Sequence, residues 1–312
     1  MKDKDTVPMP RRLITLVVVT VALGLSLVTA ITVPRATSET PRAEPAAPAT
    51  TGRASAILLP FDAYQFSPSD TDTIEAAEDV LIRACMREQR LDWHMLPPPR
   101  SAGETESLNI RRYGLTGPET AARYGYHLPP PTRAEADREA VWDARDRLPS
   151  REKLVAFGEN GVTGGCWGQA HARLLRDVPR DRTSLLGRYT VEAFDAARRT
   201  PEVKAETREW SRCMKRAGFN YADPFEAFGD PAWGKTARPS ARELTAARTD
   251  VRCKEETNLL RIWVRTDERV QRDAIREHHD DFQEFAATKE SWLNAAHRTL
   301  REGYRAYRTL AR

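Results

Sequence analysis

The chain has 312 residues, a length that suits one or two domains. Its 49 basic and 45 acidic residues give a net charge of only +4. This balance argues against a dedicated nucleic-acid binder, because binding phosphates needs an excess of positive charge on one face. Hydrophobic residues make up 40% of the chain, enough for a core, so a chain that is disordered throughout is excluded.

The N-terminal segment predicts a membrane anchor. Residues 1–12 are rich in charge and residues 13–33 carry none, and as a helix the uncharged run would be roughly 30 Å long, the thickness of a bilayer core. A cleaved signal peptide usually has a shorter apolar region, but residues 28–30 fit a cleavage site, so cleavage near Ala30 stays open. Arg11 and Arg12 precede the span, and the positive-inside rule therefore places the N-terminus in the cytoplasm and the rest outside.

Two further regions follow the anchor. Residues 34–55 are rich in Pro, Ala and Thr and lack large apolar side chains, so they predict a semi-extended linker. Residues 56–312 are expected to form an extracytoplasmic domain. No stretch shows the two-residue alternation of β-branched side chains that marks strands, and the fold class is therefore predicted to be all-α.

The cysteines predict disulfides rather than a metal site. Cys85, Cys166, Cys213 and Cys253 all lie in the expected extracytoplasmic domain, and their spacings match no zinc-binding pattern. An even number of cysteines in an oxidising compartment predicts two disulfides. We expect no bound metal and no cofactor.

An internal repeat indicates how the cysteines pair. A shift of 128 residues brings the Cys-Met pair at 85–86 onto the Cys-Met pair at 213–214, within repeat units that cover about residues 70–176 and 201–264. In the second unit Gly218 supplies a left-handed helix cap, at the place that Arg90 takes in the first. Because duplicated units tend to keep their own bridge, we expect Cys85 to pair with Cys166, and Cys213 with Cys253.

Several strings of residues carry a resemblance to a family. They are Arg112-Tyr113-Gly114-Leu115, Ala122-Arg123-Tyr124-Gly125-Tyr126, Gly165-Cys166, Trp210-Ser211-Arg212-Cys213-Met214 and Arg252-Cys253. With them, residues 70 to 300 resemble a family of uncharacterised actinobacterial exported or membrane-anchored helical proteins with paired Cys-Met motifs. The resemblance implies an α-helical extracytoplasmic domain, and it implies no established chemistry and no catalytic residue.

Helices are predicted from capping residues, prolines and apolar spacing. The expected segments are residues 70–89, 118–124, 133–147, 165–176, 183–199 and 201–217. From residue 240 onward the chain has no proline, and apolar residues recur every three or four positions. We expect one long helix from near residue 240 to the mid 280s and a second one to the end, folded back as a C-terminal hairpin. The turn could instead lie near Thr266-Asp267.

One group of aromatic and basic residues is a candidate binding surface. Its members lie mostly within the loop that the first disulfide would close: Trp93, His94, Arg112, Tyr113, Arg123, Tyr124, Tyr126 and His127. Tyr and Trp offer flat amphipathic rings and Arg offers a fork for carboxylate or phosphate, which suits peptides, glycans or anionic envelope polymers. The competing interpretation, which we favour, is that these aromatics fill a small helical core.

Two other motifs are weaker candidates. The run His278-His279-Asp280-Asp281 holds metal-ligating residue types, but it lacks the spacing of a known metal motif, and a solvated helix face is expected. The Gly-rich residues 160–165 lack the Lys-Ser/Thr of a phosphate-binding loop, so we interpret them as a flexible approach to Cys166. No Gly-x-Ser-x-Gly motif is present, and no catalytic residue is assigned.

These features favour a non-enzymatic, membrane-tethered helical module that binds a ligand or a protein or peptide partner at the cell envelope. The domain would lie outside the cell membrane on a single-pass anchor, or be secreted if the anchor is cleaved. A neighbouring interpretation is a structural or coiled-coil interaction protein. The alternative is an extracytoplasmic hydrolase that uses carboxylates between the repeat halves on a cell-wall component. Convergent carboxylates of shifted pKa in a pocket would favour the hydrolase, and an exposed apolar patch on the long helices would favour partner binding.

Overall fold

The computed structural model describes residues 57–159, 164–179 and 182–310. The predicted anchor at 13–33 and linker at 34–55 lie outside these residues. Over the described ranges the fold is all-α, with eleven α-helices, two short 3₁₀ helices and no strand. None of the helices described is both long and apolar enough to cross a membrane.

The helices predicted between residues 70 and 217 are present with small shifts at their ends. Prolines and capping side chains fix most starts: Ser67 caps α1 by accepting a hydrogen bond from the amide of Asp70, and Thr132 and Ser240 do the same for α3 and α9. Two short helices, α4 and α8, were not predicted. The elements are η1 (Pro60–Ala63), α1 (Pro68–Glu88), α2 (Pro118–Tyr124), α3 (Arg133–Asp146), α4 (Ser150–Phe157), α5 (Gly165–Leu174), α6 (Thr183–Arg199), α7 (Pro201–Arg216), α8 (Pro224–Phe228), η2 (Trp233–Lys235), α9 (Ala241–Glu256), α10 (Leu259–Glu277) and α11 (His279–Leu310).

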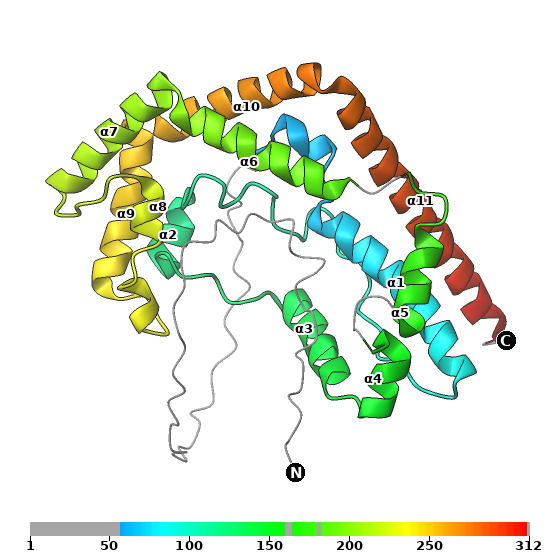
Figure 1. Ribbon diagram of the computed structural model, residues 1–312. Coiled ribbons are helices and arrows are strands. Elements are labelled where there is room, and N and C mark those ends of the chain that lie inside the picture. Colours follow the sequence, from blue (N-terminus) through cyan, green and yellow to red (C-terminus); the bar gives the residue numbers. More distant parts are fainter. Residues whose placement is uncertain (1–56, 160–163, 180–181, 311–312) are drawn as a thin grey trace, which may run out of the picture.

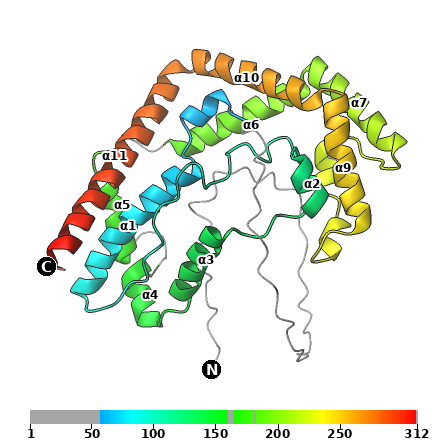
Figure 2. The same cartoon turned by 180° about the vertical axis from the view of Figure 1, so that it is seen from behind.

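The helices form an arch with two arms (Figure 1). Helices α6 and α10 lie side by side as the bridge at the top of the arch. One arm, the α1 arm, contains α1, α3, α4, α5 and α11, and the other, the α9 arm, contains α2, α7, α8 and α9. Residues 89–132, which we call the strap, run from the α1 arm to α2 on the α9 arm and back to α3; Figure 2 shows this path from behind.

Each arm contains one disulfide. Cys85 of α1 is bonded to Cys166 of α5, and Cys213 of α7 is bonded to Cys253 of α9, with Cα–Cα distances of 5.6 and 5.7 Å. These are the pairs that the internal repeat favours. Each cross-link therefore joins two helices within its own arm and leaves the two arms without a covalent bond between them other than the chain itself.

The two Cys-Met helices also end in the same way. Arg90 and Gly218 both have a positive φ, 59° and 89°, as expected for left-handed caps. In each copy the amide three residues beyond the last helical residue donates to the methionine carbonyl, from Leu91 to Met86 at 2.9 Å and from Phe219 to Met214 at 3.0 Å. The repeat seen in the sequence is thus a repeat of backbone conformation as well.

The predicted C-terminal hairpin is wrong. The helical run breaks at Asn258, which has a left-handed φ of 56°, and again at His278, giving three helices instead of two. Helix α11 does not fold back on α10 but packs along α1 (Figure 1), while the main partner of α10 is α6. The turn considered near Thr266-Asp267 is also absent, because both residues are buried inside α10. The apolar stripe did mark buried faces, but their partners lie far away in the sequence.

The apolar core is divided along the arch. The largest cluster fills the α9 arm around Trp210, Met214 and Trp263, and a second one lies in the α1 arm around Ile82, Met86 and Trp93. Smaller clusters join η1 and α6 to α11, and α1 to α5 and α11. The cluster in the α9 arm also includes Tyr113, Leu115, Ala121 and Tyr126 of the strap, so it combines residues from both repeat units.

Candidate functional site

The strap divides the predicted binding residues among three buried networks and one exposed surface. Trp93 belongs to the α1 arm, the Arg112-Tyr113 pair reaches α10, and the Tyr126-His127 pair reaches α9. Arg123 is exposed and Tyr124 is partly exposed. The structure therefore does not bring these residues together, and the aromatic side chains of Trp93, Tyr113 and Tyr126 are buried, as the competing interpretation expected.

The first network holds the strap to α10. Arg112 donates to Asp267 through Nε at 2.7 Å, and the Tyr113 hydroxyl donates to the same carboxylate at 2.8 Å. Asp267 is fully buried, and its other oxygen accepts from Gln271 at 2.8 Å. Burial raises the pKa of Tyr113, and the negative charge of Asp267 adds to this shift, so the phenol stays protonated as a donor.

The second network holds the strap to α9. Trp210 Nε1 and the Tyr126 hydroxyl both donate to the buried carboxylate of Asp250, at 2.9 and 3.3 Å. Lys254 Nζ pairs with Asp250 at 3.1 Å and donates to the carbonyl of Leu115 in the strap at 2.6 Å. Burial raises the pKa of Asp250 and lowers that of Lys254, and each partner's charge opposes that shift. Such a pair is tolerated in the interior because further hydrogen bonds satisfy both groups.

The third network lies in the α1 arm. Asp79 accepts from Trp93 Nε1 at 3.1 Å and from the amide of Leu96 at 2.7 Å, and Arg145 Nη2 contacts its two oxygens at 2.7 and 2.6 Å. The Arg145 guanidinium also lies 4.3 Å from the ring centroid of Trp93 and 4.6 Å from that of Trp142. Each of the three networks thus combines a buried aspartate, an aromatic donor and a cation.

A histidine and a glutamate lie beside the second network. Glu243 is fully buried, and its Oε1 accepts from the amide of Tyr126 at 2.9 Å and lies 2.7 Å from His127 Nδ1. The other ring nitrogen of His127 lies 2.9 Å from the carbonyl of Thr236, so the imidazolium can donate on both sides. The hydrogen bond to Glu243 is the main cause that raises the pKa of His127.

Gly125 is the residue that allows this approach. Its φ is 59°, and a Cβ at this position would lie 2.6 Å from Glu243 Oε1. The glycine of the second Arg-Tyr-Gly string is therefore needed for its backbone conformation and for the space that Glu243 occupies.

Carboxylates also converge in the α1 arm, at a small cavity. Glu75, Glu78 and Asp79 line it together with Trp142 and Trp167. The cavity has a volume of about 10 Å³, room for one water molecule and less than a sugar ring or a peptide unit needs. Burial raises the pKa of Glu75 to about 6.

The partners of these carboxylates are basic. Glu75 pairs with Arg138, which also contacts Asp72 at 3.3 Å, and Glu78 lies 2.7 Å from His171 Nδ1. The cluster lies within the α1 arm and not between the two repeat halves, where the hydrolase hypothesis placed its carboxylates. No local pattern predicted this cluster, because an acidic helix face usually faces water.

The His-Asp run on α11 has internal partners. His278 stacks on Tyr189 with ring centroids 4.7 Å apart, and Asp281 accepts from the Tyr189 hydroxyl at 2.7 Å and pairs with Arg182 at 2.8 Å. His279 and Asp280 are exposed, and His279 contacts both Asp280 and Gln283 at 3.4 Å. The side chains point to different neighbours instead of converging, and one half of the run is the solvated face that was expected.

The exposed part of the strap carries two guanidinium groups. Arg123 lies 5.2 Å above the ring of Tyr124, and Arg248 of α9 donates to the carbonyl of Ala122 at 2.9 Å. In the part of the chain that the structure describes, neither Arg123 nor Arg248 pairs with a carboxylate, whereas Arg112 does. Large apolar side chains are exposed at Leu58, Ile110, Leu128, Leu154 and Val191; none of these lies on α10, and none lies on residues 279–303 of α11, the part of that helix whose side chains are described.

Comparison with protein-family models, with curated proteins and with solved structures finds no match. Function is therefore inferred from the residues of this chain.

Proposed function

We propose that the protein is an extracytoplasmic binding module, held at the membrane by residues 13–33, that binds an acidic envelope polymer on the exposed surface of its strap. The observation that carries this proposal is the surface formed by Arg123, Tyr124 and Arg248. Two guanidinium groups that pair with no carboxylate among the described residues, next to an aromatic ring, suit a ligand that alternates carboxylate or phosphate groups with flat apolar faces.

Rigidity of the strap supports the proposal. The residues on both sides of this surface are fixed, Tyr113 by Asp267 and Tyr126 by Asp250, and α2 packs directly against α9. A binding surface that is held in place before its ligand arrives loses less conformational entropy on binding. The buried residues Tyr113 and Tyr126 thus hold in place the part of the strap that carries Arg123 and Tyr124.

The compartment follows from the cysteines. Two disulfides suggest that the domain is extracytoplasmic, since cytosolic proteins rarely keep such bonds. Only the sequence of residues 13–33 supports the single-pass anchor. Protease added to intact cells should remove the domain and leave a membrane-bound fragment, and release of the whole domain without protease would favour cleavage near Ala30.

Binding is tested with the full-length chain and two polyanions, polyglutamate for carboxylates and polyphosphate for phosphates. Arg123→Gln together with Arg248→Gln should weaken binding of the preferred polymer by about tenfold or more, and should reduce the salt dependence of the affinity. The matched control removes two charges elsewhere, by Arg272→Gln and Arg276→Gln on α10, where both side chains are exposed. Equal losses in the two double variants would show that only net charge matters, and would refute a site on the strap.

One observation favours the alternative of a carboxylate-dependent hydrolase. Glu75 has a pKa of about 6 and lies at a cavity with Glu78 and Asp79, so it could exchange a proton near neutral pH. Turnover of a cell-wall fragment that is lost in Glu75→Gln, while polymer binding on the strap is kept, would support this function. Turnover that is unchanged in Glu75→Gln would remove it.

A further inference from the structure

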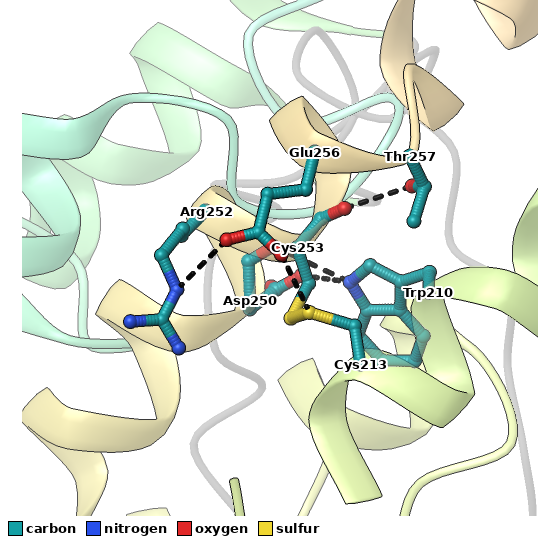
Figure 3. The surroundings of a disulfide bond; sticks show 7 residues. All are labelled: Trp210, Cys213, Asp250, Arg252, Cys253, Glu256 and Thr257. Atoms are coloured by element: carbon teal, nitrogen blue, oxygen red, sulfur yellow. Dashed lines mark hydrogen bonds and ion pairs between the residues drawn. A yellow bond between two sulfur atoms is a disulfide. The ribbon is translucent and has the colours of Figure 1, made fainter. Parts of the chain in front are cut away.

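A carboxylate faces the disulfide of the α9 arm (Figure 3). Glu256 lies one helical turn beyond Cys253 on α9, and its Oε2 is 3.4 Å from the sulfur of Cys213. One ligand atom from each of the three residues lies within 4.8 Å of the others. The cysteines are buried and the Glu256 side chain is about half exposed, so the group can be reached from solvent on the side of the carboxylate.

The positions of these residues suit a tetrahedral metal ion once the sulfurs are separated. Zinc binds thiolate at about 2.3 Å and carboxylate at about 2.0–2.2 Å, which places two thiolate ligands roughly 3.8 Å apart. Cys213 and Cys253 have their Cα atoms 5.7 Å apart, so side-chain rotation can reach that separation with α7 and α9 in place. Two thiolates and one carboxylate leave the fourth position for water, as in catalytic zinc sites.

We propose that reduction of the Cys213–Cys253 disulfide creates a site for a thiophilic divalent cation such as Zn²⁺, with Cys213, Cys253 and Glu256 as ligands. A dithiol reductant breaks the sulfur–sulfur bond, gives two electrons and two protons to the cysteines, and becomes a disulfide itself. The cation then displaces the two thiol protons, binds both thiolates and the carboxylate, and carries one water. The oxidised chain has no thiolate to offer, so the site depends on redox state.

The other arm provides an internal comparison. Gln169 lies three residues after Cys166, as Glu256 lies three residues after Cys253, and its Oε1 is 4.0 Å from the sulfur of Cys85. The backbone arrangement is repeated, but the amide is neutral and a poorer ligand for zinc than a carboxylate. Of the two arms, the proposal therefore assigns the site to the α9 arm alone.

The surroundings of Glu256 add a second comparison. Arg252 lies 3.5 Å from Glu256 Oε1, and both side chains are more than half exposed, so the ion pair is weak and a metal ion can displace it. The nearby carboxylate of Asp250 is already paired with Lys254 and Trp210 and is not free to join. Replacing Arg252 by Gln should therefore strengthen metal binding slightly, by about twofold to threefold.

The test is a titration of the full-length chain with Co²⁺, which reports thiolate ligands by its absorption. The chain is reduced with a phosphine under inert gas, and the phosphine is removed. We expect one Co²⁺ per chain with a thiolate-to-cobalt band, and no band in the oxidised chain. The double variant Cys213→Ser/Cys253→Ser should lose the band, and Cys85→Ser/Cys166→Ser should keep it.

Glu256→Gln is the decisive variant, because it leaves the disulfide and the buried core intact. It should weaken Co²⁺ binding by about tenfold or more, and Gln169→Glu is its control for added charge near a cysteine pair. The proposal is overturned if the reduced chain binds no Co²⁺, if Glu256→Gln binds as tightly as the natural chain, or if the thiolate band survives without Cys213 and Cys253.

Discussion

Replacing Gly125 by Ala tests whether the strap depends on the close approach to Glu243. Gly125 has φ 59° and ψ −130°, a conformation that residues with a side chain rarely adopt. The new methyl group would lie 2.6 Å from Glu243 Oε1, and Glu243 is fully buried and bonded to Tyr126 and His127. The methyl group therefore forces a buried carboxylate to move.

The expected cost has two parts. The backbone conformation costs about 1–3 kcal/mol for a residue with a Cβ. Moving Glu243 breaks at least one hydrogen bond to a buried acceptor, about 1–3 kcal/mol more. Together they lower the free energy of unfolding by about 2–6 kcal/mol. Gly218 is the matched control, because its φ is 89° but no atom lies within 4 Å of the added Cβ, so Gly218→Ala should cost only about 1 kcal/mol.

The assay is urea unfolding at pH 7 with both disulfides intact, followed by far-ultraviolet circular dichroism. Gly125→Ala should shift the midpoint at least twice as far as Gly218→Ala, with the slope unchanged. Arg90→Gly should shift the midpoint in the opposite direction, because Arg90 has a left-handed φ of 59° that glycine adopts more easily. The expected gain in the free energy of unfolding is about 0.5 kcal/mol. Equal losses for the two glycine variants would refute the argument from the contact with Glu243.

Three further predictions concern charge and cross-links. The pKa of His127 is raised in the folded chain, so its contact with Glu243 stabilises the fold below the ordinary histidine pKa. This stabilisation is lost as the pH rises through the pKa of the folded state. The difference in Tm between the natural chain and His127→Gln should therefore be largest near pH 5 and fade above neutrality. Lys254→Met should lower the unfolding free energy by about 3–5 kcal/mol by leaving Asp250 buried and charged, and adding Asp250→Asn should recover part of the loss in the same urea assay. Removing the Cys85–Cys166 bond should lower the free energy of unfolding by about 0.6 kcal/mol more than removing the Cys213–Cys253 bond. The reason is that the first bond closes the longer loop, with a sequence separation of 81 against 40. The reverse order would contradict the loop-entropy argument.

Helix ends and caps could be predicted from the sequence, because they depend on residues that are close together in the chain. The helix that starts at Pro118 and stops before Gly125, and the left-handed caps at Arg90 and Gly218, depend on residues only a few positions apart. The short helix α8 has such a signal as well, since Asp223 caps it ahead of Pro224. The disulfide pairing followed from the repeat.

Contacts between distant residues were beyond local patterns. Arg112 and Asp267 are 155 residues apart, and nothing near either residue shows that the other is its partner. The pair Asp250 and Lys254 has the spacing of an exposed ion pair on a helix surface, yet both residues are buried. The break at Asn258 has neither glycine nor proline to mark it. Apolar spacing predicted which faces are buried but not what covers them.

The chain enters the described fold at the bridge, and this sets where a pulling force would act. The amide of Phe61 in η1 donates to Gln271 of α10 at 2.9 Å, and Gln271 donates in turn to Asp267. Tension arriving from the N-terminal side would first load the hydrogen bonds from Ser107 and Asn109 of the strap to the carbonyl of Ile57, and then the contact between η1 and α10. Both cross-links lie in the arms, away from these contacts, so they would bear none of the initial load. Mechanical strength where the chain enters the fold therefore depends on non-covalent contacts.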